Sequence, residues 1–282
     1  MSETKTMSEE VKEVTVTKAD LKSKDFVPRG NKSSSPFNTS LYLGLRAVDC
    51  CWQYLVLSQG YGSYVIRLLR GAVIPTAAAA ETGVGLIDDL GLSGFRLVLL
   101  LMNVLAAAKH FWFVLRVAEE AWTLPGAIIV GLDNIFFDTL NNFLFLCAAT
   151  SAASHPSGET LSNPYLLAGF SLFVLGIGLE CACEIDRKRF KTDKRNKGKP
   201  YTGGLFAVVR HPNYAAFTIW RAGLAVATSG ITAGLLIATF FTWDFSNRAV
   251  PALDEYCPKR YGQMWADYKK KTRFTLIPYL TM

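Results

Sequence analysis

The chain has 282 residues, of which 50% are apolar and 19% are charged. A soluble domain typically carries about 25% charged residues, so the composition argues against a globular enzyme and favours a membrane protein. The net charge of +7 does not indicate a nucleic-acid partner, because the basic residues lie beside long apolar stretches, where orientation in a bilayer accounts for them.

The first 36 or so residues are rich in Lys, Glu, Ser and Thr and show no signal-peptide pattern. We therefore predict a disordered cytoplasmic tail over residues 1–38 and one membrane-embedded helical domain over residues 39–282. The six cysteines form no CxxC pairs, so neither a metal site nor a disulfide framework is expected.

A membrane-spanning helix needs roughly 20 mostly apolar residues. Residues 41–59 form a first, weak candidate, because Arg46 and Asp49 interrupt the apolar pattern. Residues 61–80 are amphipathic and their pattern ends at Pro75, which is typical of an interfacial or re-entrant helix.

Stronger apolar stretches follow at 93–117, 126–153 and 163–184. The last one, 214–247, is too long for a single helix and has Ser229 and Gly230 at its middle, so it predicts a tight hairpin of two helices. The fold class is therefore an all-α polytopic bundle with about six transmembrane helices.

Positive charge predicts the orientation of this bundle. The segment Arg187–Lys199 carries eight Lys or Arg, and Lys259–Arg273 carries six. Positive loops stay cytoplasmic, and six spans place both segments on the same side as the Lys-rich N-terminal tail. We expect an integral membrane protein of the endoplasmic reticulum with both termini cytoplasmic.

The strongest local motif runs from Gly203 to Tyr214, between the most basic segment and the last hairpin. Arg210 can bind an anionic group with forked donors, and His211 can move a proton near neutral pH. Asn213 can cap the following helix, whose N-terminus favours anions. An interfacial loop with a capped helix start is the alternative interpretation.

Two further stretches could complete such a site. The basic block Asp186–Lys197 can clamp phosphates or simply rest on anionic lipid. Tyr261, Trp265 and Tyr268 recur at helical spacing and can stack on an adenine, or form an interfacial aromatic belt.

Polar residues also interrupt the apolar helices. Four polar residues fall roughly on one face of a predicted span, namely Asn134, Asp138, Asn141 and Asn142. There they can position a substrate or bond neighbouring helices. Glu180 and Glu184 stand one turn apart at the end of another span, where they can pair with the basic block or orient a cofactor.

The stretch from Asp186 to Trp220 resembles the C-terminal region of the steroid 5-alpha-reductase superfamily, especially its uncharacterised membrane branch. That branch shows an acidic residue, a basic run with a Phe, a Gly-Leu turn, Arg-His-Pro-Asn-Tyr and a Trp. The tail from Cys257 to Tyr279 is also similar to that of sterol C14-reductases. The resemblance covers residues 180–282.

This resemblance implies an NADPH-dependent reductase of a carbon–carbon double bond in a hydrophobic lipid or sterol-like substrate. Asp138, His211 and Tyr214 are then the candidate catalytic residues. The candidate cofactor residues are Asp186, Arg189, Lys191, Arg195, Arg210, His211, Asn213, Tyr214, Tyr261, Trp265 and Tyr268.

The chain departs from the reductase pattern just after this motif, where Ala216 and Phe217 replace a Gly-Glu pair. The Arg-His-Pro-x-Tyr core also resembles isoprenylcysteine carboxyl methyltransferases and phospholipid N-methyltransferases, which implies S-adenosylmethionine instead of NADPH. A third alternative is a non-catalytic membrane protein that keeps the fold. In each case the expected partners are the bilayer and a hydrophobic small molecule.

Overall fold

The structure is a computed structural model and describes residues 30–58 and 60–280. Within those ranges the chain is helical, with one isolated antiparallel bridge between Val73 and Cys147 and no β-strand. This confirms the all-α prediction for the described residues. Most of the tail predicted over residues 1–38 falls on residues 1–29, outside the described ranges, and the first helix begins at Pro36.

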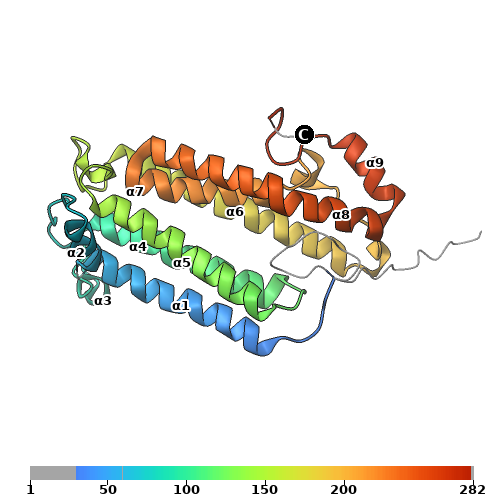
Figure 1. The fold of residues 1–282 in the computed structure, drawn as a ribbon, viewed down its shortest axis with the longest axis horizontal. Helices are drawn as coiled ribbons and strands as arrows, with labels where there is room; N and C mark the ends of the chain where they lie inside the picture. Colours follow the sequence, from blue (N-terminus) through green and yellow to red (C-terminus); the bar gives the residue numbers. More distant parts are fainter. Residues whose placement is uncertain (1–29, 59, 281–282) are drawn as a thin grey trace, which may run out of the picture.

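In the part of the chain that the structure describes, five long helices run side by side along the length of the molecule (Figure 1). Helix α1 packs against α4 and α5, and α6 packs closely against α7. The bounds of these helices are Pro36–Ser58 for α1, Gly94–Trp112 for α4, Leu124–Leu146 for α5, Pro164–Thr192 for α6 and Pro212–Asp244 for α7.

Short helices gather at the two ends of the bundle (Figure 1). Helices α2 (Tyr61–Leu68) and α3 (Gly85–Asp88) lie at one end, and α9 (Gln263–Lys271) lies at the other end with the C-terminal segment. Helix α8 (Val250–Tyr261) follows α7 after a π-helical turn at Phe245–Ala249 (η6), and a second π-helical turn at Phe113–Val117 (η2) ends α4.

The long helices begin at capping residues that the sequence supplies. The Ser93 hydroxyl accepts a hydrogen bond from the Arg96 amide at the start of α4, and Thr123 caps α5 in the same way. The Asn163 side chain accepts from two amides at the start of α6, and Pro164 occupies the first helical position. Both features stabilise helix starts.

Helix α7 is a hairpin of two antiparallel arms. Gly230 has a φ of 79° and a ψ of −176°, a conformation that residues with a side chain avoid. The Phe217 and Phe241 rings lie 5.2 Å apart across the arms, and the Tyr214 and Phe245 rings stack at 4.6 Å. The predicted hairpin at Ser229 and Gly230 is therefore confirmed.

Among the described residues, four helical stretches are long and apolar enough to cross a membrane, namely Gly94–Val117, Leu124–Leu146, Pro164–Thr192 and Pro212–Tyr261. The last of them contains the hairpin and α8. Helix α1, which matches the weak predicted span at 41–59, is not among the four and buries Arg46, Asp49 and Gln53 against its neighbours. The prediction of six spans is thus not confirmed.

Three element boundaries differ from the predictions. The amphipathic helix expected over 61–80 ends at Leu68, and the chain up to α4 is largely irregular. Helix α5 ends at Leu146, after which the chain turns, rather than near residue 153. Helix α6 continues to Thr192 through half of the basic block, because Arg and Lys are good helix formers.

Close packing of α6 on α7 depends on small residues. A methyl group added at Gly169 would lie 2.3 Å from the Ala227 amide nitrogen, and one at Gly176 would lie 2.5 Å from that of Trp220. Glycines at helix contacts let two backbones approach. This contact fixes α6 beside the first arm of α7, and these two helices supply much of the site described below.

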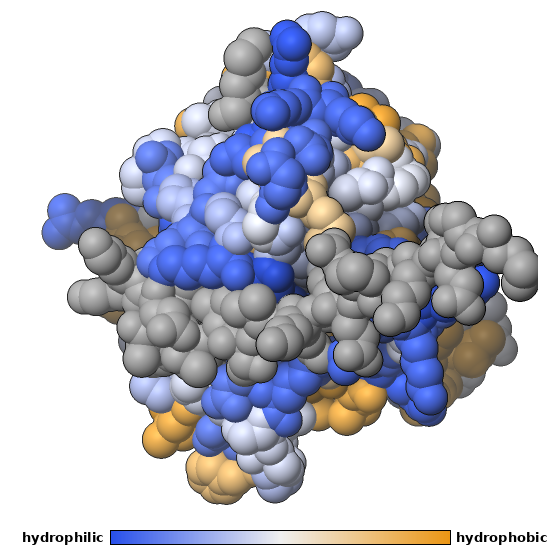
Figure 2. All heavy atoms as spheres, turned by 90° about the vertical axis from the view of Figure 1, so that its right-hand side faces the viewer, coloured by the Kyte–Doolittle hydropathy of each residue, from blue (hydrophilic) through white to orange (hydrophobic). Residues whose placement is uncertain are grey.

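Figure 2 looks onto the end of the molecule that carries α9, where hydrophilic side chains are concentrated. The basic residues of segment 187–199 belong to this end. A polar end on an apolar bundle is the arrangement expected for a protein whose helices are immersed in lipid.

Candidate functional site

Three cavities adjoin one another between the middle of the bundle and its polar end. We call them the apolar chamber, of about 390 Å³, the polar chamber, of about 260 Å³, and the aromatic recess, of about 100 Å³. The two chambers share Phe113, Glu184, Asn213 and Tyr214 in their walls. The polar chamber and the recess share six residues, Glu120, Arg187, Lys191, Phe206, His211 and Leu253.

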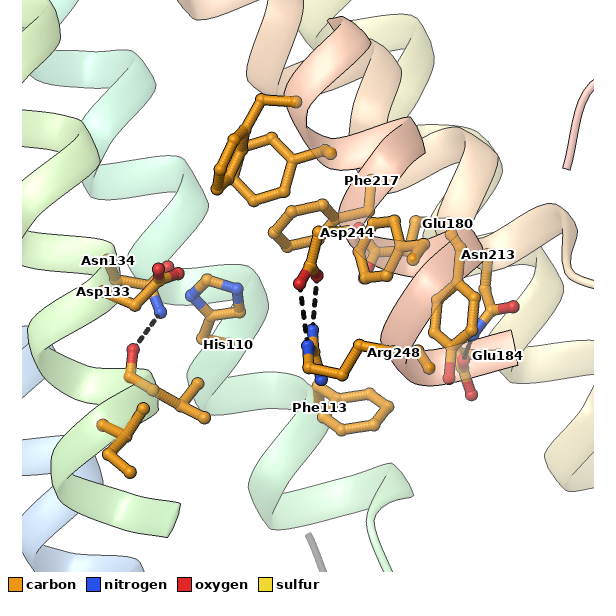
Figure 3. Close-up of a pocket in the computed structure, with 17 residues that line it drawn as sticks. His110, Phe113, Asp133, Asn134, Glu180, Glu184, Asn213, Phe217, Asp244 and Arg248 are labelled. Carbon is orange, nitrogen blue, oxygen red and sulfur yellow. Dashed lines mark hydrogen bonds and ion pairs between the residues drawn. The ribbon is translucent and has the colours of Figure 1, made fainter. Parts of the chain in front are cut away.

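The apolar chamber lies between α4, α5, α6 and the two arms of α7 (Figure 3). Six aromatic side chains line it: Phe113, Tyr214, Phe217, Phe240, Phe241 and Phe245. Four carboxylate residues also face it, namely Asp133, Glu180, Glu184 and Asp244. Asp244 accepts two hydrogen bonds, of 2.8 and 2.6 Å, from Arg248.

Glu184 stands where the two chambers meet. Its side chain is 4% exposed, and its Oε1 accepts a hydrogen bond of 3.1 Å from the Asn213 amide. Its other oxygen accepts from Arg187, one turn further along α6. A buried carboxylate with this position can bind a cationic group of a ligand, because charge interactions strengthen where water is excluded.

Glu180 lies one helical turn before Glu184 and is held in a different way. Its Oε1 accepts from the Lys109 ammonium at 2.7 Å, and its Oε2 accepts from the Trp220 indole at 2.7 Å. The Lys109 ammonium also lies 5.1 Å from the centre of the Trp220 ring. Through Lys109 and Trp220, Glu180 links α4 and α7 to α6, and it forms part of the wall of the apolar chamber.

The motif around Arg210 is joined to the C-terminal segment. The Arg210 Nη1 donates to the carbonyl oxygens of Thr272 and Arg273, at 3.0 and 2.5 Å. The backbone amides of Arg210 and His211 donate to the carbonyls of Phe274 and Thr275, both at 2.9 Å. The motif is therefore held between α6 and the tail, with His211 facing the polar chamber and the recess.

The aromatic recess is built from the chain after α7. Tyr261, Trp265 and Tyr268 line it and belong to one buried cluster, although Gly262 separates α8 from α9 with a φ of 53°. Burial raises the pKa of the Tyr268 hydroxyl, which therefore stays protonated and donates to the Phe206 carbonyl at 2.7 Å. The Trp265 Nε1 is buried and has no hydrogen-bond partner among the described residues.

The two π-helical turns lie at the apolar chamber. Phe113 opens η2, while Phe245, Arg248 and Ala249 belong to η6, and all four line the cavity. Turns of this kind redirect side chains and occur often at functional sites. Apolar periodicity gives no signal for them, so they were absent from the predicted elements.

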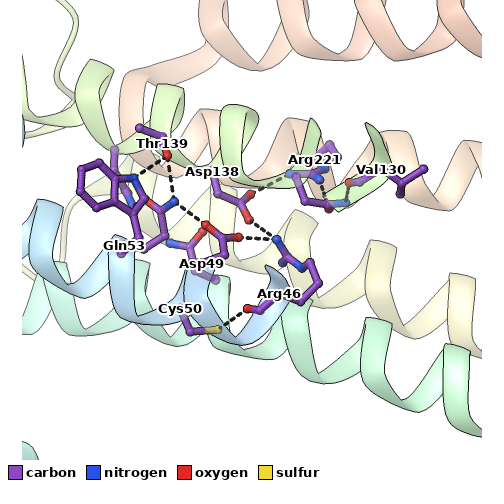
Figure 4. A network of polar contacts seen from close by, with 12 residues as sticks. Arg46, Asp49, Cys50, Gln53, Val130, Asp138, Thr139 and Arg221 are labelled. Atoms are coloured by element: carbon purple, nitrogen blue, oxygen red, sulfur yellow. Dashed lines mark hydrogen bonds and ion pairs between the residues drawn. The ribbon is translucent and has the colours of Figure 1, made fainter. Parts of the chain in front are cut away.

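Asp138 itself lines none of these cavities and lies in a polar network inside the bundle (Figure 4). The network reaches the wall of the apolar chamber at Asn134. It accepts hydrogen bonds from Arg46 at 3.1 Å and from Arg221 at 2.7 Å, and is fully buried. Asp49 also pairs with Arg46, and Arg221 donates to Asn134. Two arginines and two aspartates thus pair with one another across helices, although Nε and Nη2 of Arg46 and Nε of Arg221 have no hydrogen-bond partner among the described residues. These pairs favour the predicted helix-bonding role for Asp138.

The structure brings most of the candidate cofactor residues together. Those that line the two chambers or the recess are Lys191, Arg210, His211, Asn213, Tyr214, Tyr261, Trp265 and Tyr268. Asp186, Arg189 and Arg195 line none of the three cavities. The Arg195 side chain is 89% exposed and pairs with Asp193.

Several lining residues were not singled out as candidates from the sequence. His110 faces the apolar chamber at the end of α4 (Figure 3), and Asp133, Asp244 and Arg248 complete its polar groups. The sequence signal that did indicate this chamber is the pair of carboxylates at Glu180 and Glu184. Their spacing places both on one face of α6, and both line the chamber.

Comparison with known proteins assigns the chain to a family. Residues 110–272 match the family model described as "Protein of unknown function (DUF1295)". The chain belongs to this family. It is also 70% identical over 250 residues to "Probable O-methyltransferase ustE" of Ustilaginoidea virens, covering 88% of each chain. No solved structure matches the chain.

Two further relatives match shorter stretches. A "Protein-S-isoprenylcysteine O-methyltransferase" of Schizosaccharomyces pombe is 32% identical over 88 residues, which cover 30% of this chain and 37% of that one. A "Protein-S-isoprenylcysteine O-methyltransferase B" of Arabidopsis thaliana is 24% identical over 108 residues, covering 36% and 54%. The resemblance to isoprenylcysteine methyltransferases is thus supported, whereas the expected kinship with steroid 5-alpha-reductases is not.

Proposed function

We propose that the protein is a membrane-embedded O-methyltransferase that uses S-adenosylmethionine and acts on a hydrophobic acceptor. The observation that carries the proposal is the position of Glu184, a buried carboxylate at the junction of an apolar and a polar chamber. An acceptor in one chamber and a cationic methyl donor in the other would meet at that residue. The names of the relatives support the same reaction class.

The polar chamber and the recess suit the chemical groups of S-adenosylmethionine. Glu184 can bind a cationic sulfonium or ammonium group, and Arg187 and Lys191 can bind a carboxylate. In the recess, Trp265 and Tyr268 offer ring faces and the unused Trp265 Nε1 offers a hydrogen-bond donor to an adenine. A buried donor without a partner is costly unless a ligand satisfies it.

The same walls suit NADPH poorly. Three carboxylates, of Glu119, Glu120 and Glu184, balance the three cations of the polar chamber, Arg187, Lys188 and Lys191, so the chamber offers no excess of positive charge to a chain of phosphates. The Arg210 Nη1 is already engaged with two backbone carbonyls, and Arg195 points into solvent. We therefore set NADPH aside in favour of the methyl donor.

The residues of the chain contribute to this reaction by binding and positioning. When bound, S-adenosylmethionine supplies an electrophilic methyl group. Glu184, held by Asn213 and Arg187, would fix the charged end of the donor, while the aromatic walls exclude water from the acceptor. Alignment of two reactants in this way accounts for a large share of the acceleration of a transfer reaction.

Other parts of the proposal rest on the sequence rather than on the cavities. The domain boundary near residue 38 and the endoplasmic reticulum location remain predictions from composition, and the cytoplasmic placement of both termini remains a prediction from the positive segments. They place the polar chamber on the cytoplasmic side, where a soluble methyl donor can enter.

The direct test is methyl transfer by the purified protein in detergent. With S-adenosylmethionine labelled in its methyl group, we expect label to pass to the oxygen of a hydrophobic acceptor, with S-adenosylhomocysteine as the second product. Reduction of an acceptor by NADPH, without label transfer, would overturn the proposal.

A further inference from the structure

We propose that the methyl acceptor is the hydroxyl group of an aromatic compound, a phenol, and that His110 takes its proton during the transfer. This inference rests on the proposed methyltransferase function and adds an acceptor class and a residue to it. Three features of the apolar chamber carry the inference, namely its charge, its aromatic walls and the position of the His110 imidazole.

The charge of the chamber opposes a carboxylate acceptor. Among the described residues that line it, Asp133, Glu180, Glu184 and Asp244 are acidic, whereas Arg248 is the single Lys or Arg. Arg248 is bound to Asp244 by two hydrogen bonds (Figure 3). Two of the other carboxylates are also paired, Glu180 with Lys109 and Glu184 with Arg187. A carboxylate entering this space would therefore meet the carboxylate of Asp133 and no uncommitted cation of Lys or Arg, which is unfavourable at low dielectric. A neutral hydroxyl group has no such cost.

The walls suit a flat ring. The Phe217 ring meets those of Phe241 and Phe245 edge to face, with interplanar angles of 73° and 85°. Tyr214 stacks on Phe245 with an angle of 5°, so the chamber presents both ring edges and ring faces. Aromatic ligands gain from both arrangements beyond simple burial. The chamber volume of about 390 Å³ lies in the range of small-molecule sites.

A phenol must lose its proton as the oxygen is methylated, so the acceptor chamber needs a base. His211 lines the polar chamber and the recess but not the apolar chamber, whereas His110 lines the apolar chamber and is 7% exposed. The His110 Nδ1 has no hydrogen-bond partner among the described residues. His110 also lies one helical turn before Phe113, which borders both chambers.

The transfer moves one methyl group to the phenol and releases one proton. The phenolic oxygen forms the new bond to the methyl carbon, and the sulfur of the donor keeps the electron pair of the bond that breaks. The proton of the hydroxyl passes to the His110 imidazole and from there to water through the polar chamber. The products are an aryl methyl ether, S-adenosylhomocysteine and one proton.

The test compares acceptors of different acidity with the purified full-length protein. The probes, used at about pH 7, are 2-naphthol and 4-nitrophenol, both of which can enter the chamber as the neutral phenol. 4-Nitrophenol depends less on a base, because its hydroxyl is far more acidic than that of Tyr. N-acetyl-S-farnesylcysteine serves as the carboxylate probe. We expect the wild type to methylate both phenols and to leave the farnesyl compound largely unmodified.

The decisive variant is His110→Asn, which keeps a polar side chain of similar size. We expect it to lose about 100-fold in methylation of 2-naphthol, the usual contribution of a positioned base, and to keep most of its rate with 4-nitrophenol. His155→Asn is the matched control, because His155 bonds to Ser157 in a loop outside the site, and it should keep both rates. Equal losses with the two phenols in His110→Asn would overturn the role of the base.

Binding provides a second readout that does not depend on turnover. Without the methyl donor, 2-naphthol should raise the melting temperature of the wild type more than the farnesyl compound does. The opposite order, or a wild type that binds S-adenosylmethionine yet leaves 2-naphthol unmethylated, would contradict the acceptor class. A wild type that fails to bind S-adenosylmethionine would instead contradict the proposed function.

Discussion

Two regions of the bundle bury charged side chains, and they differ in what surrounds the charges. In the network around Asp138, each carboxylate pairs with a guanidinium, and neither Asp49 nor Asp138 lines the two chambers or the recess (Figure 4). At the junction around Glu184, the carboxylate borders two cavities. A buried charge therefore indicates a ligand site where it borders an open space, and indicates helix packing where its partners enclose it.

The contrast between the Asp138 network and the Glu184 junction is tested most directly at Asp138. Asp138→Asn removes one charge of the network and leaves Arg46 and Arg221 short of a buried anionic partner. We expect the free energy of unfolding in detergent to fall by about 3 kcal/mol, as measured by denaturant titration. Affinity for S-adenosylmethionine in the folded fraction should stay unchanged. A stable variant without ligand binding would place Asp138 in the site after all.

The opposite pattern is expected at Glu184. Glu184→Gln keeps the shape of the side chain but loses the charge that faces the ligand. We expect the dissociation constant for S-adenosylmethionine to rise by roughly 10-fold to 100-fold, because a hydrogen bond to a charged group contributes about 1.5–3 kcal/mol. Calorimetric titration measures this change.

Asp186→Asn is the control for that measurement, since Asp186 lies two residues along the same helix and lines neither chamber. If both variants bound the ligand equally well, the junction would not be the binding site.

A smaller effect is expected at Arg210, which acts through the tail. Arg210→Ala removes the hydrogen bonds to the carbonyls of Thr272 and Arg273. Affinity for S-adenosylmethionine should fall by about 10-fold as the recess loosens, and residues 272–280 should become more sensitive to carboxypeptidase. Lys197→Ala should change neither quantity. Equal effects of the two variants would show that Arg210 does not belong to the site.

The smallest effect is expected in the recess. Trp265→Phe keeps a ring but removes the buried Nε1 donor. If that donor binds the adenine, affinity should fall by about fivefold, which corresponds to about 1 kcal/mol for one neutral hydrogen bond. An unchanged dissociation constant, with unchanged stability, would show that the adenine lies elsewhere.

Much of the fold followed from local patterns. Runs of apolar residues located the long helices, and Ser229 with Gly230 located the hairpin, because a glycine in the left-handed region permits the reversal. The ends of the helices were harder to predict. Charge predicted a loop after Glu184, but Lys and Arg favour helix, and α6 continues to Thr192.

The candidate site was predictable only in part. Arg210, His211 and Tyr214 stand together in the sequence, so one motif identified one wall. Asp138 looked similar to Glu184, because both are acidic residues in apolar helices. The two differ in their partners. Asp138 pairs with Arg46 and Arg221, which lie 92 and 83 residues away in sequence. His110 has no local signal, since its chamber is formed by helices that meet only in the fold.

The measurement that tests the central claim most directly is a paired ligand titration. Thermal unfolding of the wild type and of Glu184→Gln is followed with S-adenosylmethionine and with NADPH, since a ligand that binds the folded state raises its apparent stability. We predict that S-adenosylmethionine stabilises the wild type, that Glu184→Gln loses most of that stabilisation, and that NADPH stabilises neither protein. Stabilisation of the wild type by NADPH and not by S-adenosylmethionine would contradict the account.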